Sequence, residues 1–247
     1  MYTYFDPFID DLRSTHGNNL KAVVLYGSAA TGDFVPHESD YNILIALEKI
    51  APKDLNVAHA CIREWARMGN PIPVYFTVSE LRTAADVFPI EFHQMSDARK
   101  VLYGHDVLDG IVISDEFLRH QTEYELRSKL LQLRRQYIPA SGSVEGLKRL
   151  MADSLPSFVA LFRAVLILHG LQPPATKHEI VALTAQKLVI DGSIFEKVFN
   201  IRENNFAGIL DETTANDLFG VYLEQIEKVI GAVDKVGATS SIQGESI

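Results

Sequence analysis

The arrangement of apolar residues changes near Ser114, and this change limits the folds open to the chain more than any other feature. Before Ser114, apolar residues form short runs rich in β-branched side chains, which are typical of buried strands. After Ser114, they recur with the period of a helix, and no further convincing strand pattern follows. Short strands followed by long helices predict an α+β chain, in which a small sheet domain with helices precedes an all-α helical bundle domain.

The sheet domain is predicted to span residues 1–112 and the helical bundle residues 113–235, and a small, polar, flexible tail covers 236–247. Strands are expected in KAVVLY at 21–26, DYNILIAL at 40–47 and IPVYFTV at 72–78, and helical patterns cover 4–16 and 54–69. Bundle helices are expected at 115–137, 143–170 with a break or kink at Pro156, 177–188, 192–204 and 212–235. Thr176 and Glu179 fit a capping box at the start of the third of these.

The composition argues against several classes of function. A net charge of −9 argues against a broad nucleic-acid surface, because affinity for a polyanion comes from Lys and Arg that displace counterions. No apolar run approaches the roughly 18–20 residues of a membrane span, and the acidic N-terminus is unlike an export signal. The single cysteine, Cys61, excludes an internal disulfide. We therefore expect a cytoplasmic protein with neither a membrane nor a nucleic-acid partner.

The run at 21–26 leads into a Gly27–Ser28 turn. A strand followed by such a turn directs backbone N–H groups and a hydroxyl towards an anion, and the glycine lets a phosphate approach the backbone closely. Many strand ends carry Gly-Ser only because the turn needs a small residue. The turn therefore marks a candidate phosphate site only together with the residues around it.

The stretch LYGSAATGDFVPHESDYNILIAL, residues 25–47, resembles the signature of the nucleotidyltransferase superfamily. More narrowly, it is similar to that of bacterial aminoglycoside adenylyltransferases of the streptomycin/spectinomycin type, which run from LYGS through a Gly-x-x-x-Pro loop into Ser-Asp-x-Asp. The matching positions are Gly27, Ser28, Ser39, Asp40 and, for the second aspartate, Asn42. The resemblance implies a nucleotidyltransferase-type mixed sheet, ATP binding, Mg²⁺ at Asp40 and Asn42, catalysis through Asp40, and a small hydroxylated acceptor such as an aminoglycoside.

Two of the three acidic positions of that family are not acidic here. Residues two apart on a strand share a face, so two aspartates can hold Mg²⁺ together, whereas Asn42 offers only a neutral carbonyl oxygen. The third carboxylate, a metal ligand or general base in the family, corresponds to Pro73. Glu80 or Glu91 would have to replace it, although surface glutamates need no function. The metal site is therefore predicted to be degenerate.

The resemblance continues in LFRAVLILHGLQPPATKHEIVALTAQKL, residues 161–188, where the family has an arginine and a lysine that contact the ATP phosphates. These positions match Arg163, in a nearly all-apolar helix, and Lys177, in a first helical turn where the dipole disfavours a positive charge. A snorkelling arginine and a solvated lysine would explain the same residues. Arg163 and His169 also fit the R-x(4–6)-H spacing of HEPN-type ribonucleases, although a spacing of six separates them around the helix.

Two functions remain open from the sequence. The first is a nucleotide-binding protein that holds ATP in the cleft between its domains, with a degenerate metal site. The second is an active Mg²⁺-dependent adenylyltransferase that uses Asp40 and an incomplete metal shell on a small acceptor. They differ in whether a second carboxylate stands near Asp40.

Overall fold

The computed structural model describes residues 4–31, 41–206, 208 and 210–236. The chain divides into two compact units, Met1–Ser114 and Asp115–Ile247. The tail expected at 236–247 lies outside the described residues except for Val236. Each unit is described below by itself.

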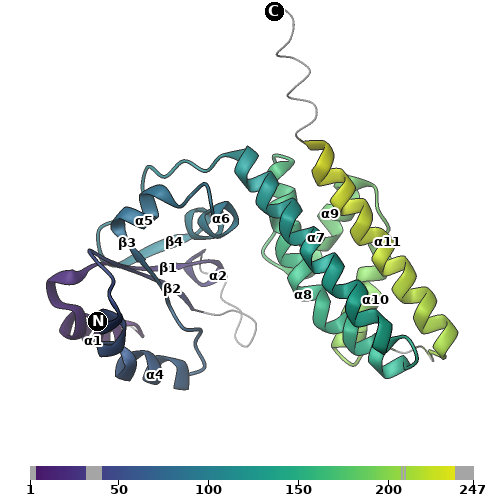
Figure 1. The fold of residues 1–247 in the computed structure, drawn as a ribbon, viewed down its shortest axis with the longest axis horizontal. Coiled ribbons are helices and arrows are strands. Elements are labelled where there is room, and N and C mark those ends of the chain that lie inside the picture. The colour runs from purple at the N-terminus through teal and green to yellow at the C-terminus, as the bar shows by residue number, and fades with distance from the viewer. Residues whose placement is uncertain (1–3, 32–40, 207, 209, 237–247) are drawn as a thin grey trace, which may run out of the picture. The chain divides into compact units, whose positions relative to one another are not determined.

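The first unit contains a mixed sheet of four strands in the order β3-β2-β1-β4 (Figure 1). Strand β1 (Leu20–Tyr26) lies antiparallel to β2 (Asn42–Leu47) and to β4 (Arg99–Gly104). Strand β3 (Val74–Thr77) is parallel to β2, and the connection between them runs through α3 (Pro52–Val57) and α4 (His59–Arg67). Because β1 and β2 occupy the centre, their side chains are buried on both faces, which explains their nearly continuous apolar sequences.

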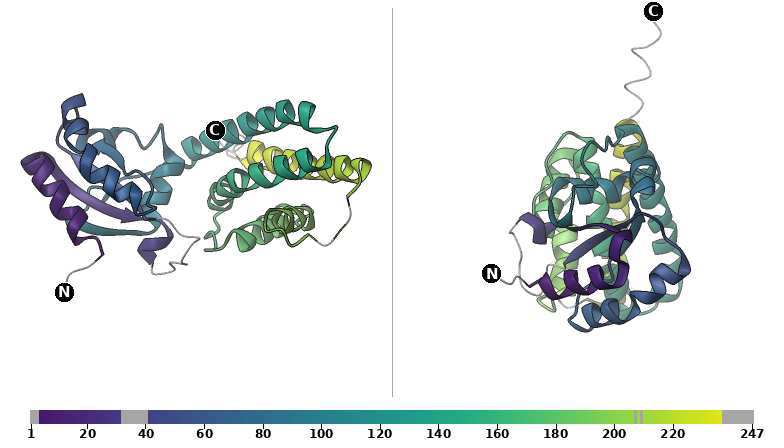
Figure 2. Two further views of the ribbon diagram at one scale, coloured as in Figure 1. Left: turned by 90° about the horizontal axis from the view of Figure 1, so that it is seen from below. Right: turned by 90° about the vertical axis from the view of Figure 1, so that its left-hand side faces the viewer.

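Helices cover both faces of this sheet (Figures 1 and 2). On one face, α1 (Asp6–His16) and α4 pack through Phe8 and Trp65, whose rings are stacked with centroids 4.3 Å apart. On the other face, α5 (Val78–Thr83) and α6 (Pro89–Asp97) pack through Leu81 and Phe92. Two short helical segments, η1 (Gly17–Asn19) and α2 (Ser28–Thr31), stand before and after β1.

Several elements of the first unit differ from the sequence expectations. The pattern at 54–69 forms two helices that meet at Ala58, and Pro52 opens the first of them. Strand β4 was not expected, since its side chains are half-buried or exposed and only pairing with β1 defines it. The expected strand at 72–78 is shorter because Thr77 caps α5, with its hydroxyl accepting from Glu80 N at 3.1 Å.

The second unit is a bundle of long helices (Figure 2). Its described elements are α7 (Asp115–Ala140), α8 (Val144–Leu168), α9 (Lys177–Leu188), α10 (Ser193–Arg202) and α11 (Glu212–Val236). Helix α8 contacts all of the others. By length and composition α8 is apolar enough to cross a membrane, but 61% of that stretch is buried inside the bundle. Its apolar sequence is therefore explained by its position at the centre of the unit.

Helix α8 passes through Pro156 without a break, so of the break or kink expected there the break is wrong. Proline lacks the N–H that would bond the carbonyl four residues earlier, the Ala152 carbonyl in this case. Arg202, the last residue of α10, donates from Nη1 to Ala152 O at 2.9 Å. A tertiary contact thus replaces the missing helical bond. The capping box at the start of α9 is confirmed, since Thr176 Oγ1 accepts from Glu179 N at 3.2 Å.

Candidate functional site

The Gly27 turn directly follows β1. Its backbone has φ of +81°, a left-handed conformation that favours glycine. Gly27 N donates to Ala98 O at 2.9 Å, and Ala30 N donates to Gly27 O at the same distance. The first bond joins the turn to the residue before β4 and uses the N–H of Gly27. The conformation of the turn therefore requires this glycine. Because the N–H of Gly27 is already used, an anion at the turn would have to accept hydrogen bonds from N–H groups of α2, which begins at Ser28.

Asn42 lies beside this turn. It pairs with Tyr26 across β1 and β2, and a Cβ atom built on Gly27 would lie 3.5 Å from Asn42 Nδ2. Alternation along β2 puts Asn42 on the face of Leu44, together with Tyr26. Ser39 and Asp40, the other predicted residues of this motif, lie outside the described residues.

Strand β3 contributes no carboxylate to the Asn42 face. Val74 and Phe76 pack with Leu44 on this side of the sheet, and Pro73 is buried just before the strand. Within the described part of the chain, no group of three His, Cys, Asp or Glu side chains could hold a metal ion. Mg²⁺ prefers charged oxygen ligands, so a neutral amide flanked by apolar side chains does not suit it. The described residues therefore do not fit the magnesium ion that the resemblance implies.

The two glutamates considered as substitutes occupy different positions. Glu80 belongs to the α5 capping box, where its Oε2 accepts from Thr77 N at 2.7 Å. Glu91 lies in the first turn of α6, which packs against β1. Burial raises the pKa of the Tyr26 phenol, and the charge of Glu91 raises it further. Among the described residues, the exposed Glu91 is thus a carboxylate near enough to Tyr26 to raise its pKa.

Arg163 and Lys177 belong to adjoining parts of the second unit. Arg163 lies within α8 and donates from Nη1 to Pro174 O at 2.9 Å, in the loop between α8 and α9. Lys177 is the first residue of α9, directly after the capping residue Thr176. The structure thus links Arg163 to the segment that ends at Lys177. The bond to Pro174 O uses one of the five N–H donors of the guanidinium.

His169 has different surroundings from Arg163. It follows the end of α8, and burial together with the charge of Lys187 lowers its pKa. Its Nε2 is buried without a hydrogen-bond partner among the described residues. The structure therefore gives the arginine and histidine of the ribonuclease-like spacing separate neighbours, Pro174 for Arg163 and Lys187 for His169.

No protein-family model and no curated protein sequence matches this chain. Among solved structures, it is similar to a crystal structure of the spectinomycin adenyltransferase AAD(9) from Enterococcus faecialis with ATP and spectinomycin. The TM-score is 0.57 at 14% sequence identity, and the match covers 94% of this chain and 100% of the other. The chain therefore has the nucleotidyltransferase fold, an α+β arrangement of a mixed sheet and a C-terminal helical region.

Sequence reasoning did not single out Tyr26, although it lies within the quoted LYGS motif. Tyr26 belongs to the candidate site because it pairs with Asn42 and because Glu91 raises its pKa. Both features depend on strand register and helix packing. The Thr77–Glu80 capping box had a readable signal, a threonine followed three residues later by a glutamate.

Proposed function

We propose that this protein binds a nucleotide, ATP by its likeness to the adenyltransferase, and that its metal site is degenerate. Arg163 and Lys177 supply phosphate contacts in this proposal, and Gly27, Ser28 and Ser39 are the positions of the first unit that the resemblance assigns to nucleotide binding. The likeness in fold supports nucleotide binding, and the neutral and apolar side chains on the Asn42 face support the loss of metal-dependent transfer.

The observation that carries the proposal is the environment of Arg163. A guanidinium in a helix with eleven buried residues is costly unless it is hydrogen-bonded. The bond to Pro174 O holds Arg163 against the loop that leads to Lys177. The two cationic side chains therefore belong to adjoining segments of the second unit. Arginine suits this role because its planar donors match phosphate oxygens.

Calorimetry on the full chain tests this proposal. We expect ATP to bind with a dissociation constant of about 1 mM or somewhat below, a weak affinity corresponding to about 4 kcal/mol. Affinity should change less than about threefold between EDTA and excess Mg²⁺, because the site adds few charged ligands to the metal that ATP carries. The absence of measurable heat at millimolar ATP under both conditions would refute nucleotide binding.

One observation favours the alternative, an active transferase acting on a small hydroxylated acceptor such as an aminoglycoside. Glu91 acts on Tyr26 beside Asn42, so α6 brings a carboxylate to this face of the sheet. A carboxylate there would serve as the general base that removes the acceptor proton. Incubation with labelled ATP, Mg²⁺ and spectinomycin or streptomycin tests this. Transfer that Asp40→Ala and Glu91→Gln both abolish would establish the enzyme and overturn the degenerate site.

A further inference from the structure

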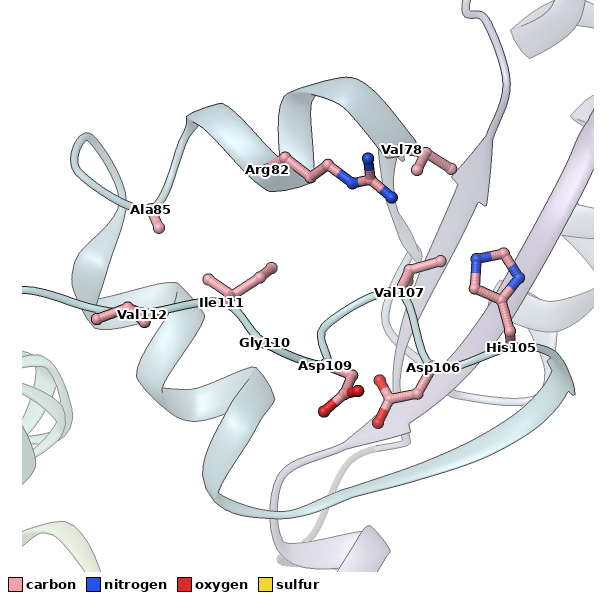
Figure 3. A pocket seen from close by; sticks show the side chains of 10 residues that line it. All are labelled: Val78, Arg82, Ala85, His105, Asp106, Val107, Asp109, Gly110, Ile111 and Val112. Carbon is pink, nitrogen blue, oxygen red and sulfur yellow. The ribbon is translucent and has the colours of Figure 1, made fainter.

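A cavity lies in the first unit, outside the elements that carry the candidate nucleotide site. It has a volume of about 440 Å³, which falls within the range of small-molecule pockets. One wall comes from α5 and the residues after it, and the other from the segment 105–112 that follows β4 (Figure 3). All of its lining residues belong to the first unit.

Local hydrogen bonds hold both walls in place. The Thr77–Glu80 capping box fixes the start of α5, so the helix that carries Arg82 has a defined origin. On the other wall, Asp106 Oδ2 accepts from Arg99 Nε at 2.9 Å and its Oδ1 accepts from Leu108 N at 3.0 Å. These contacts make the cavity pre-formed, which lowers the entropy lost when a ligand binds.

The charged side chains of the cavity leave one positive and one negative group for a ligand. The Asp106 charge is balanced by Arg99 in an ion pair. Arg82 and Asp109 have no hydrogen bond or ion pair with any described residue, nor does the His105 imidazole. In Figure 3 the Arg82 guanidinium lies across the cavity from the Asp109 carboxylate, which stands beside that of Asp106, and the His105 ring lies to one side of both. A ligand of zero net charge with separated charges would match this arrangement.

Apolar side chains complete the lining. Val78, Ile111 and Val112 border the cavity, and the Val112 side chain at its edge is 86% exposed. An aliphatic group seated here would remove this surface from water and gain hydrophobic free energy. Charged groups of both signs beside an aliphatic surface are what an amino acid with an aliphatic side chain requires.

We propose that this cavity binds a small zwitterion of the aliphatic α-amino acid class. The carboxylate of the ligand pairs with Arg82 and accepts from His105, its ammonium pairs with Asp109, and its aliphatic side chain covers Val112 and Ile111. The site is separate from the proposed nucleotide site and does not depend on it.

Protein-observed ¹⁵N NMR of the full chain, without nucleotide, tests this with three matched compounds. L-leucine carries both charges, 4-methylpentanoate lacks the ammonium, and isopentylamine lacks the carboxylate. L-leucine should shift the amides of Val78, Asp109 and Gly110 saturably. Each single-charge analogue should bind at least about tenfold more weakly, since each lacks one of the two charge-assisted contacts.

Variants assign the two charges. Arg82→Ala should weaken L-leucine binding by about tenfold or more, whereas Arg67→Ala, an exposed arginine on α4, should leave it unchanged. Asp109→Asn should remove the preference for L-leucine over 4-methylpentanoate. No saturable shift of these amides with any of the three compounds would overturn the proposal. Equal affinities for all three compounds, or unchanged binding by Arg82→Ala, would overturn it as well.

Discussion

The two units treat the polar residues of the candidate nucleotide site differently. In the second unit, Arg163 is built into the structure by a bond to the loop before Lys177. In the first unit, the face where acids are expected carries Asn42, Val74 and Phe76 among its described residues. Phosphate binding needs the cationic residues and metal-dependent transfer needs the acidic ones, so one function can persist without the other.

The two units also differ in how far a single substitution could restore the residues that the family uses. In the first unit, backbone register puts Asn42 next to Gly27 and Tyr26, so the geometry of the strand pair is intact and only the side chain is neutral. In the second unit, Arg163 joins a helix to a loop, so its removal would loosen that loop in addition to removing the phosphate contact that we propose. Four substitutions sharpen or break this comparison, beginning with the largest expected effect.

Arg163→Ala should reduce ATP affinity between about tenfold and a hundredfold, because hydrogen bonds to a charged group contribute about 1.5–3 kcal/mol. Arg119→Ala is the matched control, since Arg119 pairs with Glu123 within α7 at 3.0 Å. Calorimetry on both variants, with circular dichroism to establish that each is folded, measures the effect. Equal losses in the two variants would show that the phosphate contact is assigned to the wrong arginine.

Asn42→Asp should increase the Mg²⁺-dependent part of ATP affinity by about tenfold, because a charged oxygen replaces a neutral one beside the turn. Asn18→Asp adds the same charge at an exposed position before β1 and should leave affinity unchanged. Titrations with ATP in EDTA and in Mg²⁺ separate the Mg²⁺-dependent part of the affinity from the rest. Acceptor transfer should stay undetectable, since β3 still provides no carboxylate on this face. An equal rise in EDTA and Mg²⁺ would contradict the metal explanation.

Arg202→Ala should lower the free energy of unfolding by about 1–2 kcal/mol, because it leaves the Ala152 carbonyl without a donor. The loss should shrink in a Pro156→Ala background, where the restored backbone N–H can bond that carbonyl. Arg135→Ala, an exposed residue of α7, is the control. Chemical denaturation of the single and double variants gives the interaction free energy between Arg202 and Pro156. Purely additive losses would mean that Arg202 does not compensate for the proline.

The smallest expected effect concerns His178 in α9. Its Nδ1 lies 2.8 Å from Glu196 Oε2, its Nε2 lies 3.5 Å from Glu203 Oε1, and its ring stacks on Phe199 at 4.0 Å. Burial lowers the His178 pKa, but the hydrogen bonds and charges of the two glutamates outweigh burial and raise it above 6.5 overall. Folding therefore favours protonation of His178 relative to the unfolded chain.

The raised pKa of His178 sets the direction in which protein stability depends on pH. The stabilisation by His178 should be complete below the ordinary pKa of 6.5 and disappear as pH rises through the elevated folded value. It should stay below about 1 kcal/mol, because the side chain is 48% exposed and solvent screens the pairs. His178→Gln should lower the unfolding temperature at about pH 6 and have little effect at about pH 8.5, and His59→Gln at an exposed position of α4 is the control variant. A larger effect of His178→Gln at the higher pH would contradict the conclusion that protonated His178 stabilises the fold.

The sequence by itself determined the elements whose signals are local. The short β-branched runs predicted β1 and β2, the helical periods predicted the long helices of the second unit, and the Thr176–Glu179 pattern located the start of α9. These features depend on side-chain periodicity and on hydrogen bonds between residues a few positions apart, so they can be read along the chain. The neutral Asn42 at the second aspartate position was also visible in the sequence, as was the turn glycine.

Only the tertiary structure decided the features that depend on partners far away in the sequence. Strand β4 is defined by its pairing with β1. The Ala152 carbonyl that Pro156 cannot bond accepts from Arg202 of another helix, and Arg163 donates to a loop residue eleven positions later. Glu80 and Glu91 looked equivalent as sequence, yet one caps a helix and the other acts on Tyr26. The physical reason is that hydrogen bonds and charges act through space, and the distances between these groups are set by packing of whole elements rather than by their spacing in the chain.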